Sequence, residues 1–340
     1  MTLGAARKRV LDLSKRDIAS QKLYDHFSKH IIGQPKAVEC FTDMVTSYQA
    51  GLRDPNRPAG VAMFMGGTGS GKTYSVECAA EALFGHPQRL LKIDCAEFQH
   101  SHEIAKLVGS PAGYLGHRET HPMFRQTVLS QYFNEQYKLG IVLVDEIEKA
   151  SDSLWTLLLG VLDKATLTCG DNSVVNFSQQ IIVMTSNLGV SEMSQIMGER
   201  IGFLTGPVEV SKDKTEDVIL AALKKKFTPE FLNRIDNTVV FNTLSEYDCR
   251  DIMTKELGKA LYTVHQASRT LFRITTEAQK QIFAEGYSRE YGARNIKRSI
   301  EKHVTLPLAK VLSSDQVKEG EKTVIDYRDG KYEYSVQEND

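Results

Sequence analysis

Length and charge already narrow the classes to which this chain can belong. With 340 residues it has room for two domains, and a formal net charge of −1 provides no bulk attraction for nucleic acid or a membrane surface. No apolar run approaches a membrane span, and no signal-peptide core follows the basic N-terminus. Five scattered cysteines without a CxxC pair favour a reducing compartment. We therefore expect a cytoplasmic protein with no nucleic-acid or membrane partner.

The N-terminal part of the chain is predicted to be helical. Residues 1–27 are polar and basic with a loose apolar stripe, which indicates a short lead-in helix. A second helix opens near Pro35 and ends near Gly51, and the turn-rich segment 54–58 follows it. Ile31 and Ile32 precede this helix and fit ordinary packing as well as a binding site.

Residues 61–73 are the stretch around which the chain is organised. An apolar strand precedes a glycine-rich loop, and a helical pattern follows. The loop consists of Gly66, Gly67, Thr68, Gly69, Ser70, Gly71, Lys72 and Thr73. Glycines let backbone N–H groups surround phosphate oxygens, and the helix N-terminus adds its dipole. Lys72 can reach the outer phosphates and Thr73 can offer a hydroxyl to Mg²⁺. A plain turn is the alternative, but the complete motif favours nucleotide binding.

Downstream, residues 90–94 are predicted to form a second strand, and a polar loop ends in the segment 113–116. This loop carries Tyr114 between glycines, where the ring either anchors the loop or stays exposed. Residues 119–138 have the composition of a helix.

A second ATPase signature follows. The apolar strand 140–144 runs directly into Asp145 and Glu146. It delivers both carboxylates to the edge of a parallel sheet where nucleotides bind. Asp145 can then hold Mg²⁺ through water, and Glu146 can activate the attacking water. A solvated acidic strand end is the alternative, and it is disfavoured once both signatures occur together.

The next elements lead to another polar residue at a strand end. Ser151 is expected to cap a helix, and residues 167–177 have the pattern of a hairpin around Gly170. The strand 180–185 then ends near Asn187, which either caps the next helix or bonds the attacking water or γ-phosphate.

The remaining chain divides into a loop and a smaller domain. Residues 198–217 form a predicted exposed loop in which Ile201, Gly202 and Phe203 indicate a partner contact or a local anchor. A charged helix and a last strand follow, and the composition changes near Ser245. The predicted organisation is a lead-in helix over 1–27, a large α/β nucleotide-binding domain over 28–243, and a small, mostly helical domain over 244–340 that ends in a β-hairpin. Arg234 and Arg294 stand just outside apolar elements, where most arginines are simply solvated.

Over residues 20–335 these motifs resemble, in order, the Clp group of AAA+ unfoldases, and most of all the second ATPase module of ClpA, ClpB and ClpC. The motifs that carry the resemblance, beyond the P-loop, are Ile32-Gly33-Gln34, Gly51-Leu52 with Asp54-Pro55-Asn56-Arg57-Pro58, Gly113-Tyr114-Leu115-Gly116, Asp145 to Ala150, Met184 to Gly189, Pro229 to Asp236, and Tyr291-Gly292-Ala293-Arg294.

The resemblance implies a P-loop AAA+ parallel sheet flanked by helices, followed by a small helical lid domain. It implies ATP and Mg²⁺ as ligands, with residues 66–73 as Walker A, Asp145 and Glu146 as Walker B, and Ile31 and Ile32 near the adenine. The remaining roles implied are sensor 1 for Asn187, an arginine finger acting on the neighbouring subunit for Arg234, sensor 2 for Arg294, a pore aromatic for Tyr114, and a second pore loop for the hairpin around Gly170.

The function expected from the resemblance is an ATP-driven unfoldase and translocase in a homohexameric ring that threads unfolded or tagged polypeptide. Ile201-Gly202-Phe203 lies where some members dock on a ClpP-like peptidase, so that peptidase is a further expected partner. Gly67 replaces the usual Walker A proline, and the resemblance covers one ATPase module where ClpA, ClpB and ClpC have two. A nucleotide-switched remodelling or scaffold ATPase therefore stays open. A DNA-engaged AAA+ protein is disfavoured by the near-zero charge.

Overall fold

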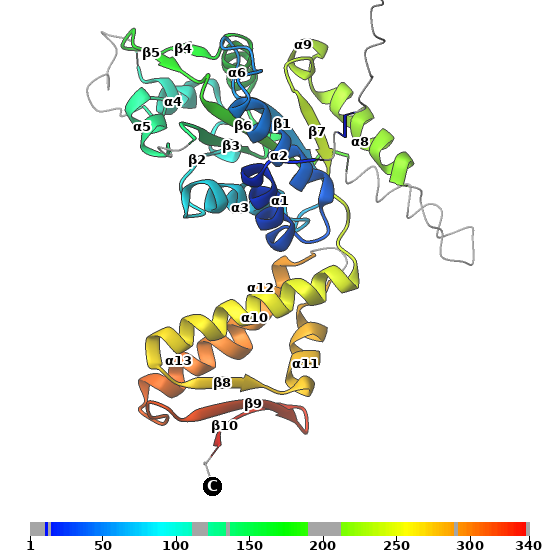
Figure 1. Ribbon diagram of the computed structural model, residues 1–340, viewed down its shortest axis with the longest axis vertical. Coiled ribbons are helices and arrows are strands. Elements are labelled where there is room, and N and C mark those ends of the chain that lie inside the picture. Colours follow the sequence, from blue (N-terminus) through cyan, green and yellow to red (C-terminus); the bar gives the residue numbers. More distant parts are fainter. Residues whose placement is uncertain are drawn as a thin grey trace, which may run out of the picture.

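A computed structural model describes residues 11–12, 15–110, 122–133, 137–189, 212–288 and 292–337. The chain forms an α/β lobe and a smaller, mostly helical lobe that meet at a narrow waist (Figure 1). Among the described residues, no helix combines the length and apolar character that a membrane span requires.

A five-stranded parallel sheet forms the centre of the larger lobe, in the order β2-β3-β6-β1-β7. Its strands are β1 (Gly60–Met65), β2 (Leu91–Asp94), β3 (Gly140–Asp145), β6 (Gln180–Ser186) and β7 (Asn237–Val240). Every residue of β1 and β6 is buried, because helices cover both faces of the sheet. Parallel pairing brings the carboxyl ends of all five strands to one edge, which is where the polar residues of the predicted site follow them.

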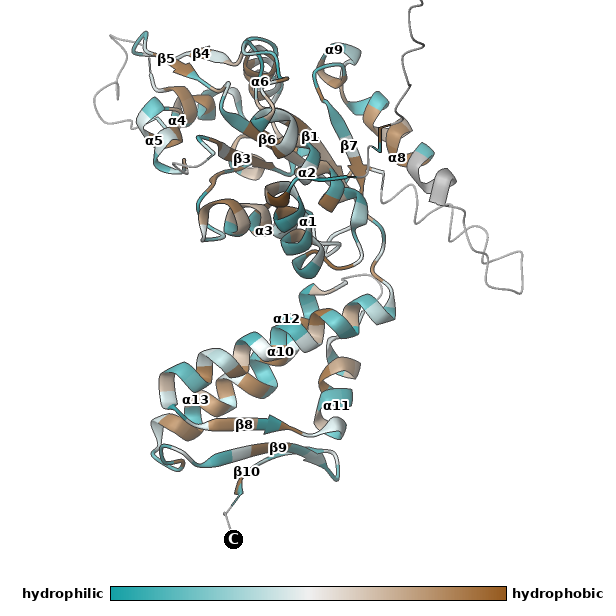
Figure 2. Cartoon of the chain, in the orientation of Figure 1, coloured by the Kyte–Doolittle hydropathy of each residue, from teal (hydrophilic) through white to brown (hydrophobic). Residues whose placement is uncertain are grey.

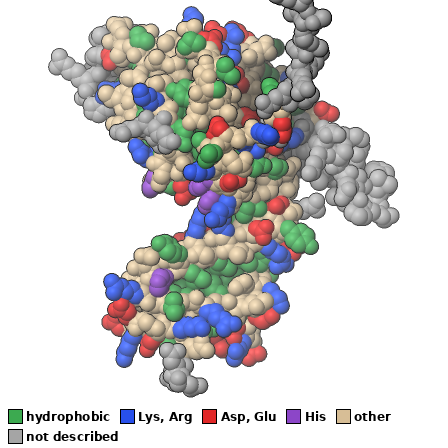
Figure 3. Space-filling view, in the orientation of Figure 1, with side chains coloured by type: hydrophobic (Ala, Val, Ile, Leu, Met, Phe, Trp, Pro, Cys, Tyr) green, Lys and Arg blue, Asp and Glu red, His purple; other side chains and the backbone are tan. Residues whose placement is uncertain are grey.

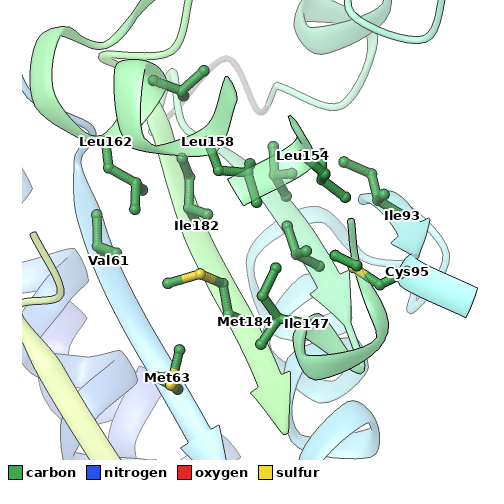
Figure 4. Close-up of a cluster of buried hydrophobic side chains, with 14 of the residues drawn as sticks. Val61, Met63, Ile93, Cys95, Ile147, Leu154, Leu158, Leu162, Ile182 and Met184 are labelled. Atoms are coloured by element: carbon green, nitrogen blue, oxygen red, sulfur yellow. The ribbon is translucent and has the colours of Figure 1, made fainter. Parts of the chain in front are cut away.

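Alternate residues of the central strands supply two separate cores. Val61, Met63 and Met65 face one cluster, and Ala62 and Phe64 face the other. Figure 4 shows the first cluster, in which side chains of α6 meet those of β1 and β6. Figure 2 shows hydrophobic residues along these strands and mixed hydropathy along the covering helices.

The helices divide between the two faces of the sheet. The helices over one face are α1 (Ile18–His30), α2 (Pro35–Gln49) and α3 (Lys72–Phe84). The helices over the other face are α4 (Ala105–Val108), α5 (Gln126–Gln131), α6 (Asp152–Lys164), α8 (Lys212–Lys226) and α9 (Pro229–Leu232). Short 3₁₀ turns cover 95–97, 101–104 and 147–149, and a hairpin of β4 (Thr166–Thr168) and β5 (Val174–Asn176) follows α6.

The smaller lobe has its own hydrophobic core, which begins at Leu244. Its helices are α10 (Glu246–Ser268), α11 (Thr276–Gly286), α12 (Arg294–Ile300) and α13 (Leu306–Ser313). Its sheet has the order β10-β9-β8 and consists of β8 (Leu271–Ile274), β9 (Lys322–Arg328) and β10 (Lys331–Gln337). Ile296, Ile300, Val304 and Leu308 recur at helical spacing along this part of the chain, and all four are buried.

A π-turn at 301–305 joins α12 to α13. Pro307 has no N–H group to donate to the carbonyl of His303, so a helical bond is lost there. The hydroxyl of Tyr334, on β10, donates to that carbonyl at 2.9 Å and restores its hydrogen bond. A proline inside the helix is thus tolerated because the terminal hairpin supplies the missing donor.

The predicted fold class, the strands and the terminal hairpin are confirmed, with four differences in detail. α1 continues past the expected boundary at residue 27 and ends at His30. α8 begins at Lys212, inside the segment 198–217 that was predicted to be a loop, because a charged run of good helix formers can be helical without an apolar period. Within the described part of 119–138 only α5 is helical, and it follows extended backbone at Arg125. β8 was not predicted, because it is a short strand that becomes one by pairing parallel to β9.

Candidate functional site

A pocket of about 280 Å³ lies between the two lobes. One end is apolar and is lined by Ile31, Ile32, Leu244 and Ile252. The other end is polar and is lined by the loop 68–73 and the carboxylates that follow β3. Figure 3 shows basic and histidine side chains gathered at the waist between the lobes. A pocket with an apolar lining and a polar lining that includes Lys72 and Arg294 fits a base joined to phosphates.

The glycine-rich loop has the backbone shape that a phosphate cradle needs. Gly66, Gly69 and Gly71 have φ values of 148°, 77° and 100°, which other residues rarely adopt. A Cβ at Gly66 would also lie 2.9 Å from the Cβ of Phe241, so no side chain fits there. Gly71 is the N-cap of α3, so the N-terminus of that helix faces the loop. The buried hydroxyl of Ser70 has no hydrogen-bond partner among the described atoms and is available to a ligand.

Lys72 lies at the base of the loop and is 8% exposed. Its Nζ donates to the carbonyls of Gly66 at 2.7 Å and Gly67 at 3.0 Å, and to Oδ1 of Asn187 at 2.8 Å. Burial lowers the pKa of Lys72 to about 8, against the opposing effect of the nearby carboxylates. The loop therefore holds a buried ammonium group whose charge is lost at mildly alkaline pH.

Thr73 and Asp145 meet at the carboxyl edge of the sheet. The Thr73 hydroxyl donates to Oδ1 of Asp145 at 3.1 Å, and the Lys92 ammonium lies 3.1 Å from Oδ2. Among the described residues, no group of three or more His, Cys, Asp and Glu is arranged to hold a metal ion by itself. One hydroxyl and one carboxylate fit Mg²⁺, which takes its remaining ligands from phosphate oxygens and water.

Glu146 is held in an unusual backbone conformation beside Asp145. Its φ of 55° is left-handed, and its N–H donates to the Thr185 hydroxyl at 3.0 Å. Its carboxylate pairs with Lys149 and accepts a hydrogen bond from Nδ2 of Asn187 at 3.2 Å. The hydrogen bond between Glu146 and Lys149 raises the pKa of Lys149. Asn187 therefore joins the candidate base to Lys72 through its two amide atoms.

The smaller lobe closes the pocket from the other side. Arg294, the first residue of α12, lines the pocket, and its charge acts on Lys72. Gly292 approaches the loop so closely that a Cβ there would lie 2.8 Å from the carbonyl oxygen of Gly69. Lys255 and Lys297 lie over the ring of Tyr74, 5.5 and 5.1 Å from its centre. The lobe therefore touches both the phosphate loop and the helix that follows it.

Arg234 lies outside this pocket. The residues that line the pocket include Arg294 but not Arg234. The Arg234 guanidinium instead pairs with Asp163 of α6 at 2.9 Å, and both side chains are about a third exposed or more. Within this chain Arg234 therefore lies apart from the pocket that contains the P-loop.

Other predicted residues lie outside the described residues. Tyr114 belongs to 111–121, and Ile201, Gly202 and Phe203 belong to 190–211.

The sequence prediction missed several residues that touch the site. These are Gln34, Tyr74, Lys92, Lys149 and Thr185. Only Thr185 carries a usable signal, because a polar residue ends an otherwise apolar strand there. Gln34 and Lys92 reach the site through pairings between segments far apart in the chain, whereas Lys149 lies three residues after Glu146 and Tyr74 directly follows Thr73.

Comparison with known proteins adds family matches to this geometry. Residues 57–238 match the AAA domain (Cdc48 subfamily), and residues 244–325 match the C-terminal D2-small domain of ClpB protein. The chain is 34% identical over 317 residues to the ATP-dependent Clp protease ATP-binding subunit ClpC of Staphylococcus epidermidis, covering 93% of this chain and 38% of that protein. It is 37% identical over 310 residues to the chaperone protein ClpB of Enterococcus faecalis, covering 91% of this chain and 34% of that protein.

A solved structure resembles the whole described architecture. It is a closed-state cryo-electron microscopy reconstruction of Hsp104 with ATPγS and FITC casein, with a TM-score of 0.77 and 28% sequence identity. The match covers 93% of this chain and 51% of that chain. The chain thus spans only about a third of the ClpC and ClpB relatives and about half of the Hsp104 chain.

Proposed function

The chain belongs to the AAA domain family, as a Clp-type second ATPase module, and from this premise we propose that it hydrolyses ATP to unfold and translocate polypeptide. The observation that carries the proposal is the pocket between the lobes, where Lys72, Glu146 and Asn187 are joined in one hydrogen-bonded chain.

The residues of this pocket divide the work of hydrolysis. Residues 66–73 bind the phosphates, and Ile31 and Ile32 contact the adenine. Thr73 and Asp145 hold Mg²⁺, which neutralises phosphate charge when bound. Glu146 accepts a proton from the attacking water, and Asn187 orients that water. Arg294 links the lid to the nucleotide.

We propose that the active form is a ring, with a hexamer as the expected size. Arg234 lies outside its own pocket, which supports a role at the nucleotide of a neighbouring subunit. There its guanidinium stabilises charge on the transferring phosphoryl group. Hydrolysis then depends on assembly, because each active site takes one arginine from the next subunit.

Threading is assigned to Tyr114 and the β4–β5 hairpin. The N–H of Gly170, at the hairpin tip, donates to the carbonyl of Val108 at 2.8 Å, and the N–H of Met123 donates to Lys106 at 3.0 Å. The two flanks of the segment that carries Tyr114 therefore lie beside the hairpin, which supports a common role for both as pore loops. An aromatic side chain can grip polypeptide without reading its sequence.

The remaining assignments extend the same proposal. The nucleotide-binding domain corresponds to 28–243 and the lid to 244–340, behind a lead-in segment 1–27. Ile201, Gly202 and Phe203 dock on a ClpP-like peptidase, and the protein works in the cytoplasm on unfolded or tagged polypeptide.

The test is ATP-dependent loss of fluorescence from a folded reporter with an unstructured tail. We expect loss of signal that becomes irreversible only when a ClpP-type peptidase is added. Glu146→Gln should bind ATP but abolish the loss, and Tyr114→Ala should keep ATP hydrolysis while losing unfolding. Normal ATP turnover without any unfolding would contradict threading and favour a nucleotide-switched scaffold.

A further inference from the structure

The turn-rich link before the P-loop strand contacts the segment that carries Arg234. Arg57 of this link donates from Nη2 to the backbone carbonyl of Arg234 at 2.9 Å, although 177 residues separate the two. The link was part of the sequence motif 54–58, to which the proposed function assigns no role.

A carboxylate completes this contact. The same Nη2 of Arg57 lies 3.4 Å from Oδ1 of Asp236, and Nη1 of Arg53 lies 2.9 Å from Oδ2. Oδ2 of Asp236 also accepts the N–H of Val61 at 3.0 Å, and the Asp236 N–H donates to the Val61 carbonyl at 3.0 Å. Asp236 is therefore tied to the first residues of the strand that leads into the P-loop.

The backbone and the side chain of Arg234 have different partners. The Asp236 side chain is 18% exposed and that of Arg57 is 34% exposed, so their pairing is partly shielded from solvent. The Arg234 side chain is 36% exposed, much like that of Arg57, and its Nη2 pairs with the half-buried Asp163. The Arg234 carbonyl is therefore held by Arg57, while its half-exposed guanidinium is held only by Asp163 among the described residues.

We propose that Arg57 is a positioning residue for Arg234, holding its backbone so that the guanidinium reaches the nucleotide of the neighbouring subunit. The proposal rests on the proposed role of Arg234 in a ring. It adds that the link 54–58 couples the start of one subunit's P-loop strand to the geometry of the next subunit's active site.

The chemistry of arginine suits this task. A planar guanidinium can bond a carbonyl and a carboxylate together, whereas a lysine ammonium forms a point charge on a flexible stem. A charged group displaced by about 1 Å from its place in a transition state costs on the order of a hundredfold in rate. A loosened backbone at Arg234 should therefore lower kcat and leave ATP binding intact.

The test compares Arg57→Gln with the matched control Arg53→Gln. Both substitutions remove an arginine paired with Asp236, but only Arg57 touches Arg234. We expect Arg57→Gln to lower kcat by about ten- to hundredfold with KM changed less than about twofold, and Arg53→Gln to lower kcat by less than about threefold. Equal losses in both variants would overturn the proposal, because the effect would then run through Asp236 alone.

Subunit mixing shows on which subunit's site Arg57 acts. Lys72→Ala subunits lack a working pocket but retain Arg57 and Arg234. Mixed with Arg57→Gln subunits, they should restore ATP hydrolysis severalfold above the sum of the two variants. If they do not, while an Arg234→Ala and Lys72→Ala mixture does recover, Arg57 acts within its own subunit and the proposal is wrong.

Two further controls keep the test decisive. If the Arg234→Ala and Lys72→Ala mixture also stays inactive, the proposed ring mechanism is wrong, and the positioning role of Arg57 is wrong as well. If Arg57→Gln fails to bind ATP or to fold, Arg57→Lys replaces it. The lysine variant retains the charge beside Asp236 but should still show a lowered kcat, and parental kcat in that variant would refute the role of the planar guanidinium.

Discussion

At the scale of single residues, the site is a chain of hydrogen-bonded and ion-paired side chains. Lys72 bonds Oδ1 of Asn187, Nδ2 of Asn187 bonds Glu146, and Glu146 pairs with Lys149. Glu148 accepts the backbone N–H of Asn187 at 3.1 Å and so holds this amide in place. One asparagine therefore contacts both Lys72, the proposed phosphate-binding residue, and Glu146, the proposed base.

The pKa of Lys72 predicts how ATP binding depends on pH. Phosphates bind the charged lysine, and its pKa of about 8 means that the free protein loses this charge above pH 8. We expect the Kd for ATP to weaken by about tenfold between pH 7 and pH 9, with proton uptake on binding at pH 9. Calorimetry in two buffers of different ionisation enthalpy measures both. An unchanged Kd over this range would contradict the buried, titrating lysine.

The lowered pKa of Lys72 also makes the free energy of unfolding depend on pH. Since the pKa of Lys72 falls from 10.5 to about 8 on folding, the unfolded chain binds more protons between these values. The contribution of Lys72 to the free energy of unfolding therefore rises with pH across that window and is smallest below pH 8.

At the scale of elements, the decisive contact joins the start of α12 to the phosphate loop. Gly292 precedes that helix with a φ of 53°, and it lies against Gly69. Arg294 then enters the pocket from the first turn of α12. A small change at Gly292 should therefore alter ATP affinity, because it moves the helix that carries Arg294.

Gly292→Ala tests this contact. The new Cβ would lie 2.8 Å from the Gly69 carbonyl, so the lid must move away from the loop. We expect ATP affinity to fall by about tenfold, with a loss of about 1–2 kcal/mol in the free energy of unfolding from backbone strain. Gly320→Ala is the control, because φ is 87° there and no atom lies within 4 Å of the added Cβ. It should lose similar stability without losing ATP affinity; equal affinity losses would contradict the contact.

At the scale of the whole molecule, two hydrophobic cores flank the central sheet and a third lies in the lid. The lid core contains fully buried residues from each of its layers, including Ile282, Ile296 and Ile325. Some of the lid residues that line the pocket are charged, among them Lys255 and Glu256. Separation of the two lobes would therefore expose polar as well as apolar surface.

We expect residues 244–340 to fold on their own. Circular dichroism during denaturant unfolding should show a single cooperative transition, because one continuous core includes α10 to α13 and the three strands. Ile325→Ala should destabilise this fragment by about 2–5 kcal/mol, since the side chain is fully buried. A gradual, non-cooperative loss of signal in the parental fragment would show that the lid depends on the larger lobe and that the boundary at 244 is wrong.

The sequence by itself determined the elements whose pattern is local. Buried parallel strands appear as continuous apolar runs, the phosphate loop as glycines between a strand and a helix, and the lid helix as apolar residues at helical spacing. For the same reason it supplied the candidates in the pocket, namely Lys72, Thr73, Asp145, Glu146 and Asn187, each of which follows directly from the end of a strand or the start of a helix.

Only the tertiary structure decided the contacts between segments that lie far apart in the chain. It set Arg234 apart from the pocket and Arg294 within it, although in the sequence both arginines stand just outside apolar elements. It paired Lys92 with Asp145 and Arg57 with Arg234, and it made β8 a strand by pairing it with β9. The apolar periodicity of the sequence does not predict such pairings, because they depend on how strands align and where helices cross rather than on neighbours in sequence.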